Sequence, residues 1–216
     1  PAGGEWGRAA TNDIIRSRSR QLKKGITYRQ SPIDHVDVAG NEVHLTDGGV
    51  LPYDVLVIAT GARIAPEETE GLLGDGWNEK VFTFYSAEGA TALERALDEF
   101  EGGRIVVNVV DMPIKCPVAP LEFCFLADWF FTERGIRDKV QLTYVTPLDG
   151  AFTKPVAAQQ LGGMLAEKGV DLVTEYNTGE VDGAAGTLIS FDGREVPFDL
   201  AVVIPVHMGA EYVGRS

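Results

Sequence analysis

Short, continuous runs of apolar residues dominate the hydrophobic pattern of this chain. Residues 55–59, 104–110 and 201–204 form such runs, and each is of strand length. Runs of this kind, bounded by turn residues, are typical of parallel strands that are buried on both faces of a sheet. Segments with helical spacing lie between the runs. The pattern therefore predicts an α/β fold.

Helical spacing of apolar residues occurs in three segments. The predicted helices are residues 86–100, 120–134 and 155–168. The first begins with Ser86, a favoured N-cap, and stops at the pair Gly102-Gly103. The third ends at Lys168, where Gly169 supplies a left-handed cap. We expect the first helix to connect two domains.

A repeat relates the two halves of the chain. Lys24-Gly25 opens one copy and Lys168-Gly169 opens the other, 144 residues later, while Asp47-Gly48 and Asp192-Gly193 are 145 residues apart. Each copy reads as a strand, a hairpin around an Asp-Gly turn and a final buried strand. The predicted strands are 26–29, 42–45, 50–52 and 55–59 in the first copy, and 170–174, 187–191, 195–197 and 201–204 in the second.

The second copy is preceded by further elements that complete a doubly wound unit. These are strands at 104–110 and 141–145, alternating with the last two helices. By the same count, we expect roughly 40 residues of the first unit to precede Pro1, with residues 7–24 supplying only the region of its second helix. The sequence thus predicts tandem Rossmann-like, doubly wound parallel sheets with antiparallel hairpin inserts, the first domain incomplete.

This reading divides the chain into three parts. Residues 1–85 would be the C-terminal portion of a first Rossmann-like domain, 86–102 a connecting helix, and 103–216 a second such domain. A truncated first domain would leave an exposed sheet edge, so we expect the chain to self-associate as a homo-oligomer.

Charge and composition exclude several classes of function. The net charge of −13 disfavours phosphate backbones and anionic lipid headgroups, so we expect no nucleic-acid partner. No apolar run reaches the roughly 18 residues of a membrane helix. Two cysteines and three scattered histidines form neither a disulfide framework nor an evident zinc site, so no metal is expected.

The loop after the strand at 104–110 carries the most informative chemistry. A nicotinamide-binding domain should have a glycine-rich loop here, yet residues 111–119 contain no glycine. The next strand, 141–145, ends in Thr146-Pro147, without an acid to hold a ribose hydroxyl. Both features argue against NADH as the electron donor.

Cys116 stands where those glycines would be. A helix N-terminus and the neighbouring Lys115 would both favour its thiolate, the nucleophilic form. Glu122, in the first turn of the helix, is either a capping acid or a proton carrier. Cys116 taken alone favours an inert loop thiol, and the missing glycines together with the flanking residues reverse that preference. Cys124, between two phenylalanines, is expected in the core.

A second candidate segment follows the run at 55–59. Its residues are Ala59, Thr60, Gly61, Ala62 and Arg63. A small-polar-glycine turn at the end of a buried parallel strand lets the backbone approach a ligand closely, although a simple tight loop reads the same way.

Two stretches resemble a known family. Residues 53–62 resemble the flavin-contacting segment of FAD-dependent pyridine nucleotide-disulfide oxidoreductases, and residues 113–123 resemble the cysteine segment of its sulfide:quinone reductase-like members. The resemblance implies an FAD cofactor held by residues 59–63 with Pro113 and Lys115, and catalysis by Cys116 and Glu122. Electrons would pass from sulfide through flavin to a quinone.

The resemblance also carries departures and alternatives. The second cysteine and the later flavin segment expected of that family are absent from the chain. The histidines of the chain do not coincide with those expected near the family's active site. His207 could face the flavin, or lie in a surface loop. We therefore expect an active parent enzyme, cytoplasmic or peripheral to a membrane, and an isolated chain that is inactive and binds FAD weakly or not at all. The alternatives are an NADH-dependent flavoprotein reductase or NADH dehydrogenase, and an inactive, flavin-free fragment.

Overall fold

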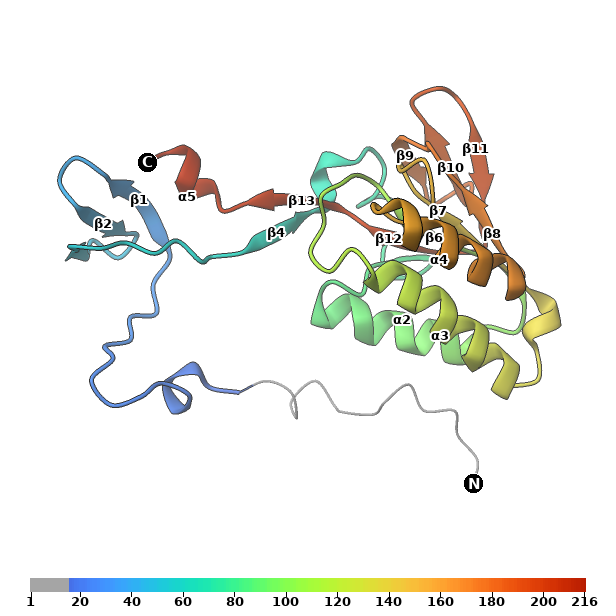
Figure 1. Ribbon diagram of the computed structural model, residues 1–216, viewed down its shortest axis with the longest axis horizontal. Helices are drawn as coiled ribbons and strands as arrows, with labels where there is room; N and C mark the ends of the chain where they lie inside the picture. Colours follow the sequence, from blue (N-terminus) through green and yellow to red (C-terminus); the bar gives the residue numbers. More distant parts are fainter. Residues whose placement is uncertain (1–15) are drawn as a thin grey trace. The chain divides into compact units, whose positions relative to one another are not determined.

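A computed structural model describes residues 16–216 of the chain. The described residues form two compact units (Figure 1). The larger contains residues 64–207, and the smaller contains the residues up to Arg63 together with Met208–Ser216. The helix expected within residues 7–24 falls mostly outside the described residues, and the part inside them has only the 3-10 turn η1 (Arg18–Arg20).

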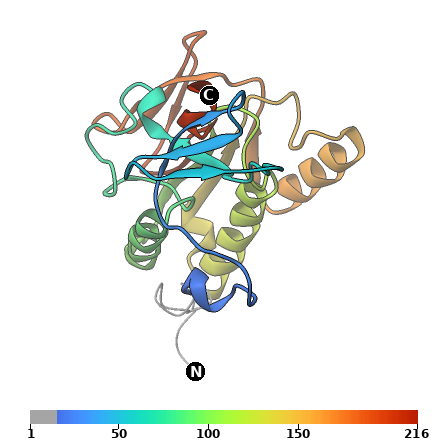
Figure 2. The ribbon, with the colours of Figure 1, turned by 90° about the vertical axis from the view of Figure 1, so that its left-hand side faces the viewer.

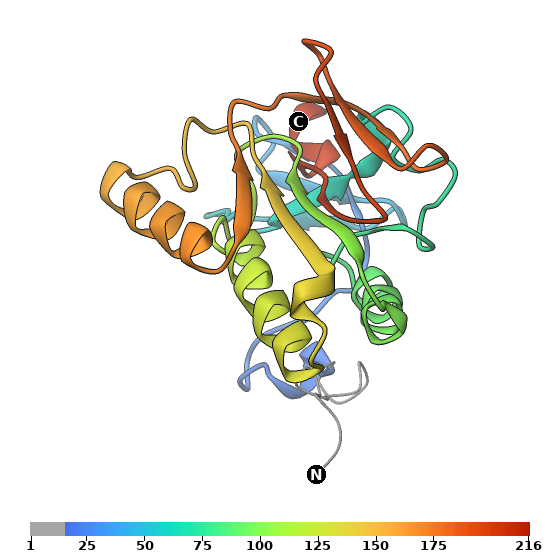
Figure 3. The same cartoon turned by 90° about the vertical axis from the view of Figure 1, so that its right-hand side faces the viewer.

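A five-stranded parallel sheet forms the centre of the larger unit (Figure 3). Its strands, in spatial order, are β5 (Val81–Phe82), β12 (Leu200–Ile204), β6 (Gly103–Val109), β7 (Val140–Val145) and β8 (Val170–Val173). The last strand in the sequence thus lies beside the first strand of the βαβ repeat, which is the order of a dinucleotide-binding half-sheet. The strands predicted for the second copy are confirmed.

Helices cover one face of this sheet. They are α2 (Ala87–Glu99), α3 (Ala119–Glu133) and α4 (Pro155–Glu167), which agree with the predicted helices to within two residues. The oxygen of Ser86 accepts a hydrogen bond from the amide of Gly89 at 3.1 Å, as an N-cap should. Ile105 and Val107 of β6 point into this helical layer, and Cys124 of α3 is fully buried in it, as predicted.

An antiparallel sheet covers the other face. It consists of β9 (Thr178–Asp182), β10 (Thr187–Ser190) and β11 (Glu195–Pro197), in the order β11-β10-β9. Val181 and Leu188 of this sheet pack against Val106 and Val203 of the parallel one. The sequence predicted a doubly wound sheet, in which helices would lie on both faces. In the structure the hairpin insert provides the second layer, because its apolar side chains fill that face.

An ion-pair network around the buried carboxylate of Asp128 fastens the helical layer to the sheet. The carboxylate of Asp128 on α3 is 2.8 Å from Nε of Arg137 and 3.0 Å from Nζ of Lys168. Arg137, in the 3-10 turn η3 (Arg137–Lys139), also donates to the carbonyls of Val140 and Gly169 at 2.6 Å and 3.1 Å. Val140 is the first residue of β7, and Gly169 directly precedes β8. Arg137 therefore fixes the backbone at the start of both strands.

The smaller unit is built on a three-stranded antiparallel sheet (Figure 2). Its strands are β1 (Ile33–Asp37), β2 (Glu42–Leu45) and β3 (Val50–Pro52). The short helix α5 (Glu211–Gly214) packs on this sheet through Tyr212, which contacts the buried side chains of Val36, Val43 and Leu45. Strands β4 (Ala62–Ala65) and β13 (Val206–Gly209) pair with each other, and η2 (Pro66–Glu68) follows β4.

Two strands predicted for the first copy do not form. Residues 26–29 have no strand structure, and neither do residues 55–59, where Val55 and Val57 are 82% and 79% exposed. A buried parallel strand needs a hydrogen-bonded neighbour on each side. Among residues 16–216, no strand lies beside residues 55–59. The apolar run therefore forms no strand and is exposed except at Leu56, which packs against the core of the smaller unit, and the prediction of a buried strand was wrong for this chain.

Candidate functional site around Cys116

The loop between β6 and α3 presents Cys116 at the surface. The loop is anchored by Val110 and Ile114, which are buried, while Cys116 is exposed. Cys116 has a φ of 48°, in the left-handed region that non-glycine residues seldom adopt. Its carbonyl accepts the amide of Ala119 at 3.0 Å, so the cysteine immediately precedes the first turn of α3. The peptide before Pro113 is cis.

Tyr85, which follows β5, holds this loop from the side. Its hydroxyl donates to the carbonyl of Lys115 at 2.6 Å and lies 3.1 Å from the carbonyl of Cys116. Burial chiefly, together with the negative charges that Cys116 and Glu122 carry when ionised, raises the pKa of Tyr85 to about 12. The phenol therefore stays protonated and remains a donor to the loop over the whole physiological range.

His207 on β13 packs against the same tyrosine. The two rings meet edge to face with centroids 5.0 Å apart. Nδ1 of His207 lies 2.9 Å from the carbonyl of Pro205, which can only accept, so Nδ1 carries the proton. Nε2 is then an acceptor; it is buried and has no hydrogen-bond partner among the described residues. Burial, and secondarily the charge of Lys115, lowers the pKa of His207, so its ring is neutral near pH 7.

These groups bring a thiol, a cation, a carboxylate and a neutral imidazole to one corner of the larger unit. Nζ of Lys115 lies 6.0 Å from the centre of the Tyr85 ring, and Glu122 is exposed in the first turn of α3. An exposed cysteine next to a lysine and a helix N-terminus is the environment of reactive rather than structural thiols. The arrangement suits nucleophilic chemistry at sulfur, with a proton acceptor close by.

The structure brings together four of the residues proposed from sequence, and adds Tyr85, which was missed, and His207, which was left undecided. Pro113, Lys115, Cys116 and Glu122 share the loop and the first turn of α3. Tyr85 was not singled out, and His207 was left undecided, because they come from distant segments and only the fold places them beside the loop. No local pattern could have found them beyond their positions after apolar strands.

Cys124 takes no part in this site. Its side chain is fully buried in the helical layer, and burial raises the pKa of its thiol well above the usual value. A protonated, inaccessible thiol is a poor partner for a redox pair with Cys116.

The predicted flavin segment belongs to the smaller unit. Gly61 has a φ of 71°, and no atom lies within 4 Å of the place where a Cβ would stand. The backbone there is open to a ligand, which is the property that a close flavin contact requires. Thr60 Oγ1 lies 3.2 Å from the hydroxyl of Tyr212, and Nε of Arg63 lies 3.6 Å from the carboxylate of Glu211. Ala59 is exposed, and Ala62 begins β4.

The layered sheets described above define the class of protein: an α/β chain with the fold of FAD- and NAD(P)-binding oxidoreductases. The sulfide:quinone oxidoreductase of Aquifex aeolicus matches this structure with a TM-score of 0.69 and 23% sequence identity, over 84% of this chain and 43% of that chain. At this identity the match shows the fold. No protein-family model matches the chain.

Sequence comparison identifies relatives within that class. The chain is 23% identical over 208 residues to the mitochondrial sulfide:quinone oxidoreductase of Mus musculus, covering 94% of this chain and 46% of the relative. It is 27% identical over 210 residues to the sulfide-quinone reductase of Aquifex aeolicus, covering 90% and 46%. The chain is thus a distant homologue of sulfide:quinone oxidoreductases and other FAD-dependent pyridine nucleotide-disulfide oxidoreductases.

The chain's length relative to its relatives and the character of its helices complete the comparison. The chain spans about half the length of the curated relatives that it matches. Of the helices in residues 16–216, none has the length and apolar character that crossing a bilayer requires.

Proposed function

We propose that this chain is part of an FAD-dependent oxidoreductase that oxidises sulfide and passes the electrons to a quinone. One observation carries the proposal above all. The loop where a nicotinamide-binding domain needs glycines presents an exposed cysteine, Cys116, three residues before the start of helix α3. The loop is therefore better suited to a sulfur substrate than to a pyrophosphate.

In the net reaction, hydrogen sulfide and the Cys116 thiol together lose two electrons and two protons, one proton from each, to a quinone, which becomes a quinol. A sulfur–sulfur bond replaces one S–H bond of each, and Cys116 is left as a persulfide. Cys116 acts as the sulfur acceptor, and this role needs an accessible thiolate. The structure supports the role through the exposure of the thiol and its place beside Lys115.

The neighbouring side chains would manage position and protons. Tyr85 fixes the loop through its hydrogen bond to the Lys115 carbonyl. Nε2 of His207, unprotonated and without a partner among the described residues, is available to accept a proton. Glu122 offers a second, exposed acceptor in the same corner. These groups would accept the protons that sulfide and the thiol give up.

FAD would be held in part by the open backbone around Gly61, with Ala59, Thr60, Ala62 and Arg63 as its neighbours in the chain. When bound, flavin supplies a two-electron acceptor that can pass electrons on one or two at a time. The contribution of this segment is an approachable backbone, because Gly61 carries no side chain and adopts a left-handed conformation.

The proposal is tested by mixing the flavin-loaded protein that contains this chain with sulfide or with NADH, anaerobically and in separate samples. We expect sulfide to bleach the flavin absorbance and NADH to leave it unchanged. Cys116→Ser should abolish bleaching by sulfide, whereas the matched control Cys124→Ser should retain it, because Cys124 is buried away from the site. Bleaching by NADH alone would show a nicotinamide-dependent reductase instead.

A second test needs no flavin. Incubation of the chain with inorganic polysulfide transfers a sulfane sulfur to a reactive thiolate and releases a polysulfide that is one sulfur shorter. Intact mass spectrometry should show one added sulfur atom, lost in Cys116→Ser and kept in Cys124→Ser. An unmodified wild-type chain would argue against Cys116 as the sulfur acceptor.

A further inference from the structure

Four polar side chains share one face of the hairpin formed by β1 and β2. His35 and Asp37 lie two residues apart on β1, and Glu42 and His44 lie two residues apart on β2. The register pairs His35 with His44 and Asp37 with Glu42, so all four point to the same side of the sheet. The opposite face carries the buried apolar residues of this unit, Val36, Val43 and Leu45.

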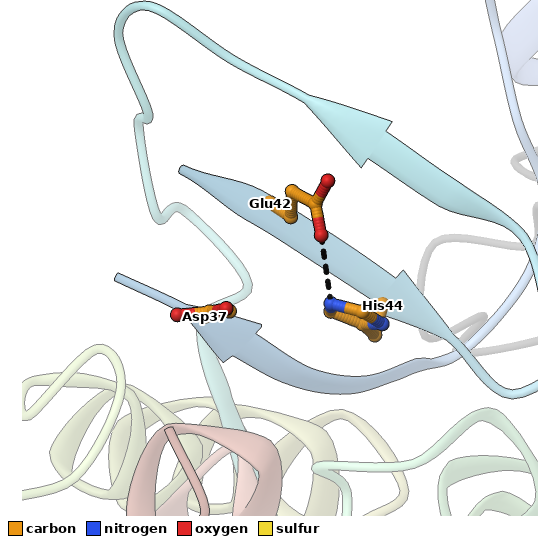
Figure 4. Close-up of side chains that lie close together, drawn as sticks. All are labelled: Asp37, Glu42 and His44. Carbon is orange, nitrogen blue, oxygen red and sulfur yellow. Dashed lines mark ion pairs between the residues drawn. The ribbon is translucent and has the colours of Figure 1, made fainter. Parts of the chain in front are cut away.

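Three of these side chains have the spacing of metal ligands. One ligand atom each from Asp37, Glu42 and His44 lies within 4.8 Å of the other two (Figure 4). Nε2 of His44 is 3.3 Å from Oε2 of Glu42. A tetrahedral ion with bonds of about 2.0–2.1 Å sets neighbouring ligand atoms about 3.3 Å apart. The histidine and the glutamate therefore already stand at the separation of two ligands on one ion.

Their orientation is set by neighbouring groups. Oδ1 of Asp37 accepts hydrogen bonds from the amides of Ala39 and Gly40 at 3.0 Å and 2.9 Å. A Cβ at position 40 would lie 2.6 Å from Asp37 Oδ2, so the glycine leaves that oxygen room. The ring of His35 stacks on the ring of His44 with centroids 4.3 Å apart and planes 9° apart, which holds the plane of His44.

The repeat shows which of these residues the hairpin itself requires. The equivalent hairpin, β9 and β10, has strands of the same length and pairs Asp182 with Thr187 and Glu180 with Ile189. The aspartate that enters the turn is present in both hairpins. The positions of Glu42 and His44 hold a threonine and an isoleucine in the other hairpin. The fold therefore does not need a carboxylate and an imidazole there, and their presence calls for another explanation.

We propose that Asp37, Glu42 and His44 form a binding site for a divalent first-row transition metal ion of the Zn²⁺ type. Two carboxylates and one imidazole are a suitable set for such an ion, whereas Ca²⁺ takes six to eight oxygen ligands and Mg²⁺ a near-octahedral set. All three side chains are partly exposed, so solvent can complete the coordination. His35 is a positioning residue that keeps the ligating ring in place.

The test is a titration of the metal-stripped chain with Zn²⁺ by calorimetry and with Co²⁺ by visible absorption. We expect one equivalent to bind, with the d–d bands of a low-coordinate Co²⁺ site. His44→Ala and the isosteric Glu42→Gln should each weaken binding by about tenfold or more, while circular dichroism shows the fold retained. His35→Phe, which keeps a stacked ring, should bind like the wild type, and His35→Ala more weakly.

Two control variants separate this site from other metal-binding groups of the chain. His207→Ala removes a histidine outside the hairpin, and Cys116→Ser removes an exposed thiol that is itself a zinc ligand by chemistry. Both should keep the Co²⁺ spectrum. A wild-type chain that binds no Co²⁺ would overturn the proposal, since Glu42 and His44 would then be a simple ion pair. Binding that survives Glu42→Gln and His44→Ala, or that disappears in Cys116→Ser, would overturn it as well.

Discussion

The hairpin sheets of the two copies match closely, whereas the parallel strands before and after the hairpin form only in the second copy. Strands β1, β2 and β3 of the first copy correspond, in chain order, to strands β9, β10 and β11 of the second. Their Asp-Gly turns have nearly the same geometry, with φ of 83° at Gly48 and 82° at Gly193. Beyond the third strand, residues 200–204 form β12, which is buried between two parallel neighbours, whereas residues 55–59 form no strand and are all exposed except Leu56.

The difference shows that the local sequence is sufficient to form a hairpin but not to form a buried parallel strand. A hairpin is closed by local hydrogen bonds and a turn of suitable chemistry. A central parallel strand depends on neighbours that are far away in the sequence, and on layers that cover both of its faces. The same apolar pattern therefore gives a core strand in one copy and an exposed segment in the other.

The largest expected effect contrasts two equivalent valines. Val202→Asp would place a charge in the centre of the parallel sheet, where Val202 is fully buried, and should destabilise the larger unit by more than about 4 kcal/mol. Val57→Asp, at the matching position of the first copy, should change the free energy of unfolding by no more than about 0.5 kcal/mol. Urea denaturation followed by circular dichroism measures both.

The same variant tests the exposed segment further. Because Val55, Val57 and Ile58 present apolar surface, we expect the wild-type chain to self-associate and Val57→Asp to do so less, as light scattering would show. A wild-type monomer, or a Val57→Asp variant that unfolds like Val202→Asp, would mean that this segment is covered in solution.

The next effect concerns the helical layer that supports β12 and its neighbours. Asp128→Ala leaves Arg137 and Lys168 without their shared carboxylate and should cost about 1.5–3 kcal/mol of unfolding free energy, the range for hydrogen bonds to charged groups, because both cations still reach solvent. The matched control, Asp138→Ala, removes an exposed carboxylate from the adjoining turn and should cost no more than about 0.5 kcal/mol. Equal effects of the two variants in urea denaturation would contradict a role for the network around Asp128.

The hairpins themselves should respond alike. Gly48→Ala and Gly193→Ala each force a Cβ into a left-handed turn, although no atom lies within 4 Å of either position. Backbone strain alone should therefore cost about 1–2 kcal/mol in each case. Amide hydrogen exchange reports the loss separately in β1–β3 and β9–β11. A large difference between the two variants would show that the hairpins are not energetically equivalent.

The smallest effect is a dependence on pH. The pKa of His207 is lowered by burial and by Lys115, so in the folded protein the ring stays neutral below the usual value of about 6.5. As the pH falls through that value, the unfolded chain takes up a proton that the folded protein refuses, and stability decreases. His207→Gln should remove this part of the pH dependence. An NMR titration that places the midpoint of His207 at or above 6.5 would contradict it.

Sequence patterns predicted most of the larger unit, because its strands and helices have strong, regular spacing. They missed β1 and β9, whose alternating polar residues do not stand out. They also predicted a buried strand at residues 55–59, which does not form. At the site, Lys115, Cys116 and Glu122 came from a local motif. Tyr85 and the ligand set of the β1–β2 hairpin became visible only in the folded chain, since cross-strand and long-range neighbours leave no local signal.

The place of β12 in its sheet also governs how the larger unit is made. This strand lies between β5 and β6, yet it is the last of the five to be synthesised. At about 5–20 residues per second, a ribosome needs roughly 5–18 s to extend the chain from the end of β6 to the start of β12. During that interval β5 and β6 both have an open edge. A nascent chain that stops short of Leu200 therefore has its three helices but lacks the strand that joins β5 to β6. We expect such a chain to be a substrate for chaperones rather than a stable subdomain.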